Sequence, residues 1–121
     1  MAKWQLDAML DAGLAYISSN VTQIFVCDTQ PTTYAEASST YALTSTETPT
    51  FTGPANGDAS GRKLTIDEEA DMTITSTGTA LHVALTSADT LIYVTTCTSQ
   101  ALTSGGTVTI PAWDIEIADA T

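Results

Sequence analysis

Five short runs rich in strand-forming residues follow one another along the second half of the chain. They read RKLTI (62–66), DMTITST (71–77), TALHVALTS (79–87), TLIYVTTC (90–97) and TVTIPAWDIEIA (107–118). Turn-forming residues separate them, in the segments DEEA, STG, SADT and TSQALTSGG. Strands at such regular spacing with local turns are typical of antiparallel sheets that form a sandwich or a small barrel. The sequence therefore predicts a mainly β fold, an antiparallel β-sandwich or a small jelly-roll-like barrel with a short N-terminal helix.

The helix is predicted for residues 1–18. Its apolar residues recur at spacings of three and four and so share one face: Leu6, Met9, Leu10, Leu14 and Ile17. Asp7 and Asp11 lie off that face, and the segment SSN ends the helix. We interpret this segment as a helix packed on a sheet. The alternative is a docking arm with Trp4 at its exposed end.

Residues 21–121 are predicted to form the β-rich body of a single domain that spans 1–121. The segment VTQIFVCD (21–28) is apolar on both faces, which indicates a central strand. The segment YAEASS (34–39) predicts one helical turn, and TYALTSTET (40–48) predicts a second strand. No internal repeat or linker divides the sequence, and its 121 residues suit one domain with a modest core.

The charge of the chain restricts its partners. Fourteen acidic residues face three basic ones, which gives a formal net charge of −11. Nucleic-acid binding depends on Lys and Arg side chains that neutralise phosphates, so we expect no nucleic-acid partner, and an anionic membrane surface is disfavoured for the same reason. No segment approaches the ~20 apolar residues that span a bilayer, and Asp7 and Asp11 interrupt the apolar core that an export signal needs.

The two cysteines, Cys27 and Cys97, form no CxxC pair. Cys27 stands in the apolar run IFVC, which indicates a buried and reduced thiol. A Cys27–Cys97 disulfide stays open as an alternative if their strands are neighbours.

The stretch FTGPANGDASGRKLTI (51–66) is rich in glycine and holds two of the three basic residues. A phosphate-binding loop would need Lys followed by Ser or Thr, whereas Gly61 is followed by Arg62, Lys63 and Leu64. A nucleophile elbow needs the pattern G-x-S-x-G, and a calcium loop needs several alternating acidic ligands; the stretch supplies neither. We interpret it as a long loop that leads into a strand.

Two acidic patterns also have a non-catalytic interpretation. The segment IDEEADM is expected to form a solvated acidic turn at Asp67 to Asp71, with calcium binding as an open alternative. In WDIEI, alternation places Asp114 and Glu116 on the outer face of a strand. Their spacing also fits the paired carboxylates of glycosidases, but no sugar-stacking cleft is indicated beside them.

The only histidine, His82, is interpreted as a residue on the face of a sheet. Alternation groups it with Ala80 and Ala84, opposite Leu81, Val83 and Leu85. No nucleophile or orienting acid can be assigned to it, and the cysteines do not stand at zinc-ligand spacing. The sequence thus predicts no catalytic residue, no cofactor and no metal site, and a protein that is not an enzyme.

Four stretches of the chain resemble a family of small virion-associated proteins from tailed bacteriophages and prophages. They are CDTQPTTYAEASSTYAL, FTGPANGDASGRKLTI, TSTGTALHVAL and SQALTSGGTVTIPAWDIEIADAT. The family's patterns are a QPTTYAEA turn, an FTGPANGDxSGRK loop, a TGTATH strand entry and an ending similar to FDIEIADP. The resemblance runs from Leu6 to the end. The chain departs from it in the acidic DEEAD and in TALHVAL, which replaces TATHWAL.

The resemblance implies a head decoration, or cement, protein on the outer surface of the phage capsid. Such a protein would be made in the cytoplasm of the bacterial host and would bridge subunits of the major capsid protein through buried interface. A homo-oligomer is expected, with a trimer favoured because copies joined at a symmetry axis gain avidity. An acidic surface suits a protein that faces outward from packaged DNA.

The interface candidates under this hypothesis are Trp4, Tyr16, Arg62 and Lys63. Aromatic side chains dominate interface hot spots, and the two cations are the concentrated positive charge of an acidic chain. Arg62 and Lys63 can equally be solvent-exposed strand residues. Two other classes stay open: a phage tail or tail-fibre-associated structural protein, and a carbohydrate-binding β-sandwich. The second would use aromatic residues spread along the chain, Tyr34, Tyr41, Tyr93 and Trp113.

Overall fold

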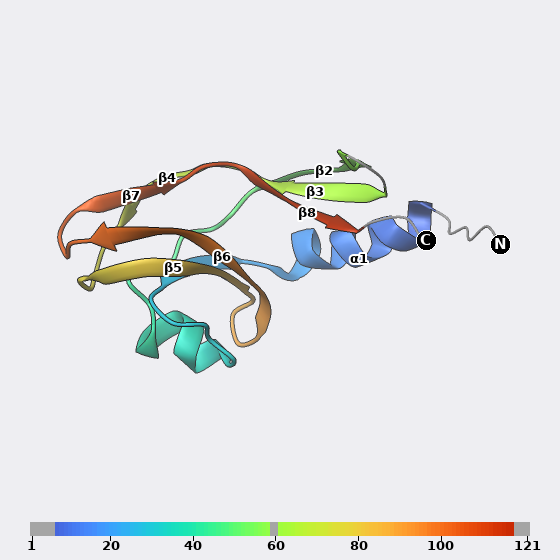
Figure 1. The fold of residues 1–121 in the computed structure, drawn as a ribbon. Coiled ribbons are helices and arrows are strands. Elements are labelled where there is room, and N and C mark those ends of the chain that lie inside the picture. The colour runs from blue at the N-terminus through green and yellow to red at the C-terminus, as the bar shows by residue number, and fades with distance from the viewer. Residues whose placement is uncertain (1–6, 59–60, 118–121) are drawn as a thin grey trace. The chain divides into compact units, whose positions relative to one another are not determined.

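The computed structural model of the chain describes residues 7–58 and 61–117 (Figure 1). In chain order the elements are α1 (Asp7–Asn20), β1 (Gln23–Cys27), the π-helical turn η1 (Glu36–Thr40), β2 (Phe51–Asn56), β3 (Arg62–Ile66), β4 (Glu69–Thr73), β5 (Gly78–Thr86), β6 (Leu91–Leu102), β7 (Thr107–Ile110) and β8 (Trp113–Ile117). All strand pairs are antiparallel.

The prediction of a mainly β fold with a short N-terminal helix is confirmed. The strands form three antiparallel sheets, with the orders β1-β5-β6, β2-β3-β8 and β4-β7, an arrangement consistent with a small β-sandwich. No closed barrel forms among the residues that the structure describes. The jelly-roll-like barrel, the alternative left open by the sequence, is therefore not the fold.

The described residues fall into two compact units. The first unit is built from the described parts of Met1–Asn20, Thr50–Glu68 and Pro111–Thr121, and the second from Val21–Pro49 and Glu69–Ile110. The helix α1 and the β2-β3-β8 sheet belong to the first unit, and the other two sheets belong to the second. The single domain over residues 1–121 stays a prediction.

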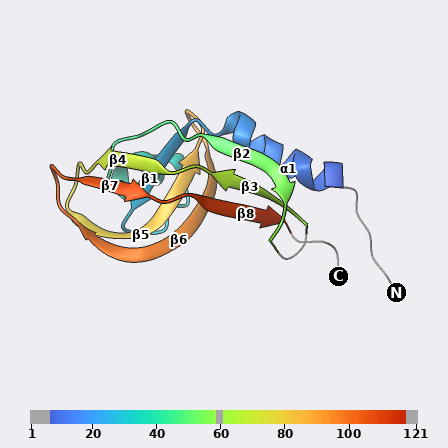
Figure 2. The same cartoon turned by 90° about the horizontal axis from the view of Figure 1, so that it is seen from above.

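Strand β5 forms the centre of the three-stranded sheet in the second unit, with β1 on one side and β6 on the other (Figure 2). Side chains on one face of this sheet, among them Phe25, Cys27 and Ala84, pack with Ala37 of η1. The alternate residues point to the opposite face, and of these Ile24, Val26 and Leu85 are fully or almost fully buried. The sheet is therefore covered on both faces, which explains why β1 is apolar throughout.

The prediction that VTQIFVCD forms a strand is correct, but β1 is the end strand of its sheet and not a central one. On one side β1 pairs with β5, and on its other side it bonds to the irregular segment that follows η1. There the amide of Leu43 donates to the carbonyl of Val26 at 2.8 Å, and the amide of Ile24 donates to the carbonyl of Glu47 at 3.0 Å. Both edges of β1 are thus satisfied.

The expected strand at TYALTSTET (40–48) is wrong, because this segment makes only isolated bridges. It crosses between the two sheets of the second unit instead of running along either one. The amide of Leu43 bonds to β1, while its carbonyl accepts the amide of Thr75 at 2.8 Å, and the amide of Ser45 donates to the carbonyl of Thr73 in β4 at 2.9 Å. A segment that changes partner within three residues cannot keep a regular ladder.

Two boundaries in the second half of the chain also differ from expectation. The run 107–118 is not one strand, because it divides into β7 and β8 around Pro111 and Ala112. Proline has no amide to donate to a ladder, which is why the run breaks there. The segment 98–106 was expected to be a loop, but its first residues extend β6 to Leu102.

The first unit places α1 against the β2-β3-β8 sheet. Leu10 and Leu14 of the helix are buried, as are Leu64, Ile66 and Ile115 of the sheet. Gly13 lies close to the sheet as well, since a Cβ atom built on it would stand 3.4 Å from Cδ1 of Ile117. The interpretation of the N-terminal segment as a packed helix is therefore correct for residues 7–20, whereas residues 1–6 lie outside the described part.

The stretch 51–66 is a β-hairpin and not, as expected, a long loop leading into a strand. Residues Phe51–Asn56 form the edge strand β2, which pairs with β3. Its register shifts between Thr52 and Ala55, where Gly53 has φ +111° and precedes a cis bond to Pro54. A bulge on an edge strand is a place where proline is tolerated, so the Gly-Pro pair did not prevent a strand.

The cysteines are free, and Cys27 is fully buried, as predicted. Their strands are not neighbours, because β5 lies between β1 and β6. Two strand spacings amount to about 9–10 Å, beyond the reach of a disulfide.

Burial raises the pKa of the Cys27 thiol to about 12 from its ordinary value of 9.0, and the nearby Asp28 carboxylate adds to the shift. Because the folded-state pKa lies above the unfolded-state pKa, the neutral thiol contributes stability that is complete below pH 9.0 and is lost as the pH rises toward 12.

We expect the difference in unfolding free energy between wild type and Cys27→Ala to shrink between pH 9.0 and about 12, by at most about 1.4 kcal/mol per pH unit. Urea unfolding at several pH values measures it. A difference that stays constant through the window would contradict the assignment.

Candidate interaction surfaces

Arg62 and Lys63 point to opposite faces of the first unit's sheet. Successive residues of β3 alternate between faces, and the buried Leu64 and Ile66 mark the face on which α1 packs. Arg62 shares that face, whereas Lys63 shares the outer face with Thr65. The two cations, which the sequence presented as one positive patch, therefore do not form one.

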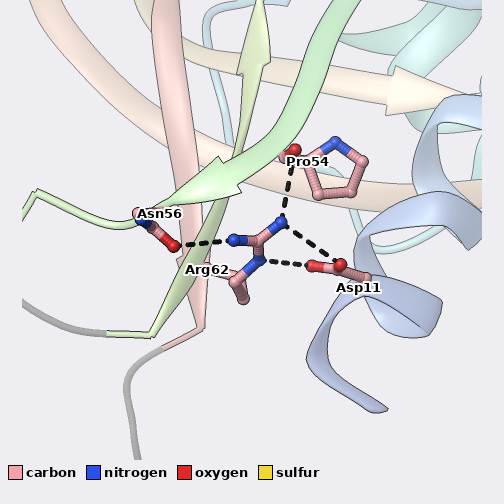
Figure 3. A network of polar contacts seen from close by, with 4 residues as sticks. All are labelled: Asp11, Pro54, Asn56 and Arg62. Atoms are coloured by element: carbon pink, nitrogen blue, oxygen red, sulfur yellow. Dashed lines mark hydrogen bonds and ion pairs between the residues drawn. The ribbon is translucent and has the colours of Figure 1, made fainter. Parts of the chain in front are cut away.

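The guanidinium of Arg62 is held by a network of oxygen atoms (Figure 3). Its Nε donates to Oδ1 of Asp11 at 2.7 Å, and its Nη2 donates to Oδ2 of the same carboxylate at 3.3 Å. In addition, Nη1 donates to Oδ1 of Asn56 at 2.7 Å and Nη2 donates to the carbonyl of Pro54 at 3.5 Å. The fork-shaped contact with Asp11 is the strong, directional kind of ion pair.

This network joins three elements of the first unit. Asp11 belongs to α1, Pro54 and Asn56 belong to β2, and Arg62 opens β3. The side chains of Arg62 and Asp11 are 18% and 32% exposed, so the pair is partly shielded from water. The bulge at Gly53 presents the Pro54 carbonyl to the network, and an added Cβ at Gly53 would stand only 3.2 Å from the carbonyl oxygen of Lys63. Glycine is favoured there because its φ of +111° is a conformation that residues with a side chain rarely adopt, and because the space for a Cβ is tight.

The outer face of the same sheet carries a second polar network, centred on Lys63. Its Nζ lies 2.7 Å from Oδ1 of Asp58 and 3.6 Å from Oδ2 of Asp114. The hydrogen bond that Lys63 donates to Asp58 is the main cause that raises the pKa of Lys63. Asp114 also accepts a bond from Thr65 Oγ1 at 2.7 Å, and Glu116 accepts the backbone amide of Asp58. Lys63 thus has its charge balanced within its own unit.

These contacts confirm the predicted alternation of WDIEI, in which Asp114 and Glu116 face outward and Ile115 is buried. Both carboxylates hold the hairpin, Asp114 through Thr65 of β3 and Glu116 through the amide of Asp58, two residues after the end of β2. No pair of carboxylates faces a cleft among these contacts.

Tyr16 lies on an exposed flank of α1. Tyr16 is 57% exposed and Met9 61%, and in the described part of the chain the other large exposed apolar side chain is Leu81, at 38%. At about 100° per residue, Met9 and Tyr16 point in nearly the same direction, roughly 100° to 120° from Leu10, whereas Asp11 lies on the opposite flank. The apolar face of the helix was therefore predicted too wide, because Met9, which was assigned to it, is exposed. Trp4 and Leu6 lie outside the described residues.

The acidic turn at Asp67 to Asp71 and His82 are the other places for which the sequence raised a chemical role. Across 7–58 and 61–117, no group of three or more His, Cys, Asp or Glu side chains is placed to hold a metal ion. Asp67 instead accepts the hydroxyls of Thr50 and Thr52, at 3.0 and 2.8 Å. His82 is partly buried beside Cys27, on the sheet face predicted for it. Leu81, which was grouped with the buried Val83, is exposed because a register shift lies beside it.

The aromatic residues considered for glycan binding are all partly buried: Tyr34, Tyr41, Tyr93 and Trp113. The hydroxyl of Tyr34 donates to Oε1 of Gln23 at 3.0 Å. The hydrogen bond with Glu36 is the main cause that raises the pKa of Tyr41. These side chains therefore contact their own chain instead of offering an exposed stacking surface.

Comparison of the chain with protein-family models, with curated protein sequences and with solved structures found no match. Within the described residues, no helix is long and apolar enough to cross a membrane.

The separate roles of the two cations predict different effects on stability. Arg62→Ala leaves Asp11 without its guanidinium on a partly shielded surface, so we expect a loss of about 1–3 kcal/mol in unfolding free energy. Lys63→Ala removes a contact with Asp58, which is 67% exposed, and a longer one with Asp114 at 3.6 Å, so we expect a smaller loss than for Arg62→Ala. Chemical denaturation measures both.

A double-mutant cycle supplies the control for this prediction. If Arg62 acts through Asp11, the effects of Arg62→Ala and Asp11→Ala will not add, with a coupling of about 1 kcal/mol or more. Additive effects, or a larger loss for Lys63→Ala than for Arg62→Ala, would contradict the assignment.

Proposed function

We propose that this chain is a capsid decoration, or cement, protein of a tailed bacteriophage or prophage. In this role it binds the outer surface of the mature head and stabilises it by bridging subunits of the major capsid protein. It is made in the cytoplasm of the bacterial host and acts in the virion. The resemblance of its QPTTYAEA, FTGPANGDASGRK and DIEIAD segments to virion proteins is the starting point of the proposal.

One structural observation supports the proposal: α1 presents Tyr16 and Met9 on the same flank, about two turns apart, and the helix is held in place. Leu10 and Leu14 bury its inner face, and the ion pair from Asp11 to Arg62 ties its far flank to the sheet. An aromatic side chain on a fixed support loses little conformational freedom on binding, which favours it as an interface anchor. The flank therefore fits attachment to a protein surface.

The charge supports the same role. A formal charge of −11 keeps a protein soluble at high local concentration and repels the packaged DNA. The chain is proposed to act as a homo-oligomer, with a trimer favoured because joined copies bind a symmetric shell with higher avidity. The alternative is a structural protein of the tail or tail fibre, which would bind a protein surface in the same way at a different position in the virion.

Binding of the purified chain to heads that lack it tests the proposal. Tyr16→Ala is expected to weaken binding at least tenfold, a loss of about 1.4 kcal/mol or more, because it truncates the anchor without touching the core. Leu81→Ala is the matched control, since it truncates an exposed apolar residue of the second unit. Co-sedimentation of labelled protein with heads gives the binding curves.

Different outcomes test the proposed function and the proposed anchor on α1. Failure of the wild-type chain to bind such heads would overturn the proposed function. Wild-type binding that Tyr16→Ala and Met9→Ala both leave unchanged would exclude the helix flank as the interface. Lys63→Ala then tests the outer sheet face, whereas Arg62→Ala is unsuitable because it also loosens α1.

A further inference from the structure

The residue pair Asn56–Gly57, at the end of β2, is chemically labile in water. The backbone nitrogen that follows an asparagine can attack the carbonyl carbon of its side chain, and glycine leaves that approach open because it has no Cβ. Asn56 is exposed, so water reaches it. The other asparagine in the sequence, Asn20, precedes Val21, whose branched and buried side chain hinders the same attack. Asn56 is therefore the more reactive of the two.

The reaction at this pair is a deamidation in two steps. The Gly57 nitrogen gives its proton to hydroxide or water and forms a bond to Cγ of Asn56, while Nδ2 takes up a proton and leaves as ammonia. The product is a five-membered succinimide ring, which one water molecule opens at either of its two carbonyls. Opening leaves an aspartate at position 56 or an isoaspartyl linkage, in which the main chain runs through the side-chain carbon.

The hairpin opposes the first step at the nitrogen of Gly57. This amide donates to the carbonyl of Gly61, across the hairpin, at 2.9 Å. The peptide group is planar, and in the succinimide the new bond from nitrogen to Cγ takes the direction that the hydrogen occupies in the intact chain. In the folded chain that direction points at Gly61. The ring can therefore close only after this hydrogen bond breaks.

The Arg62 network opposes the same step at the side chain of Asn56. Nη1 of Arg62 donates to Oδ1 of Asn56 at 2.7 Å (Figure 3). The two residues are direct partners in the ladder between β2 and β3, so both side chains leave the sheet on one face, roughly perpendicular to it. The Gly57 amide instead points across the hairpin. Rotation of Cγ toward the Gly57 nitrogen thus pulls Oδ1 away from Arg62.

We propose that Asn56 is a site of spontaneous deamidation, and that Arg62 is a positioning residue that keeps the reaction slow in the folded chain. An isoaspartyl linkage adds one carbon to the main chain at the end of β2 and so displaces the pair Asn56↔Arg62. The modified chain then loses one of the contacts through which Arg62 joins β2 to Asp11 of α1. The proposal follows from the hairpin and does not rest on the proposed capsid function.

The full chain, incubated at mildly alkaline pH either folded or in urea, provides the test. Mass spectrometry of its peptides measures the exchange of NH2 for OH at Asn56 and at Asn20 separately. We expect deamidation of Asn56 to be at least about tenfold slower in the folded chain than in urea, because ring closure needs local opening. Asn20 stays largely intact in both samples. Asn56→Gln removes the signal, since glutamine would have to close a larger ring.

Variants at Arg62 test its role as a positioning residue. Arg62→Ala is expected to raise the folded-state rate at least about threefold and to leave the rate in urea unchanged. Arg62→Lys keeps the charge but lacks the planar fork, so its rate should lie between those of wild type and Arg62→Ala. Cys27→Ala is the control for a general loss of stability, since it removes a buried atom from the second unit, and its rate should stay within about twofold of wild type.

Hydrogen exchange of the Gly57 amide in the wild-type chain gives a readout that needs no variant. The amide is expected to be protected in the folded chain, and the protection should decrease in both Arg62 variants. A folded chain that deamidates as fast as the chain in urea, or an unprotected Gly57 amide, would overturn the restraint by the hairpin. A folded-state rate that neither Arg62 variant changes would overturn the role of Arg62, and an intact Asn56 in urea would overturn the site itself.

Discussion

The ion pair between Arg62 and Asp11 is the contact on which the first unit depends. It joins the flank of α1 to the first residue of β3, and the same guanidinium holds Asn56 and the Pro54 carbonyl of β2. Apolar burial at Leu10 and Leu14 supplies the main attraction between helix and sheet, but it is not directional. The fork-shaped pair is directional, so it favours the rotation of the helix that brings Asp11 to Arg62. That rotation leaves Tyr16 exposed, and the proposed attachment to a capsid follows from it.

Much of the fold could be predicted from local patterns. The run RKLTI coincides with β3, and the alternation of WDIEI gave the correct faces of β8. The failures have tertiary causes. Gly53 and Pro54 indicate a loop in isolation, yet a bulge on an edge strand accommodates both. The segment around Leu43 has strand composition, but it bonds to two sheets in turn, and no local pattern reveals that.

In the candidate site, too, local patterns predicted some features, while others depend on tertiary contacts. Alternation along RKLTI already groups Arg62 with Leu64 and Ile66, so the sequence carried a signal that this cation faces the core and needs a partner. The partner itself could not be identified, because Asp11 lies 51 residues away and nothing local links the two. Likewise the helical period placed Met9 beside Leu10, but the width of the buried stripe depends on the sheet beneath it.

In the proposed role, this small acidic β-protein acts through its surfaces, as an abundant structural component of a phage head. The charges of Arg62 and Lys63 are balanced within the first unit, while Tyr16 on α1 is exposed. The most direct test is the copy number of the chain in purified virions, measured by quantitative mass spectrometry against the major capsid protein. The proposed role predicts a number close to that of the capsid subunits. A number far below it would place the chain in the tail or at a vertex, and absence from the virion would contradict the account.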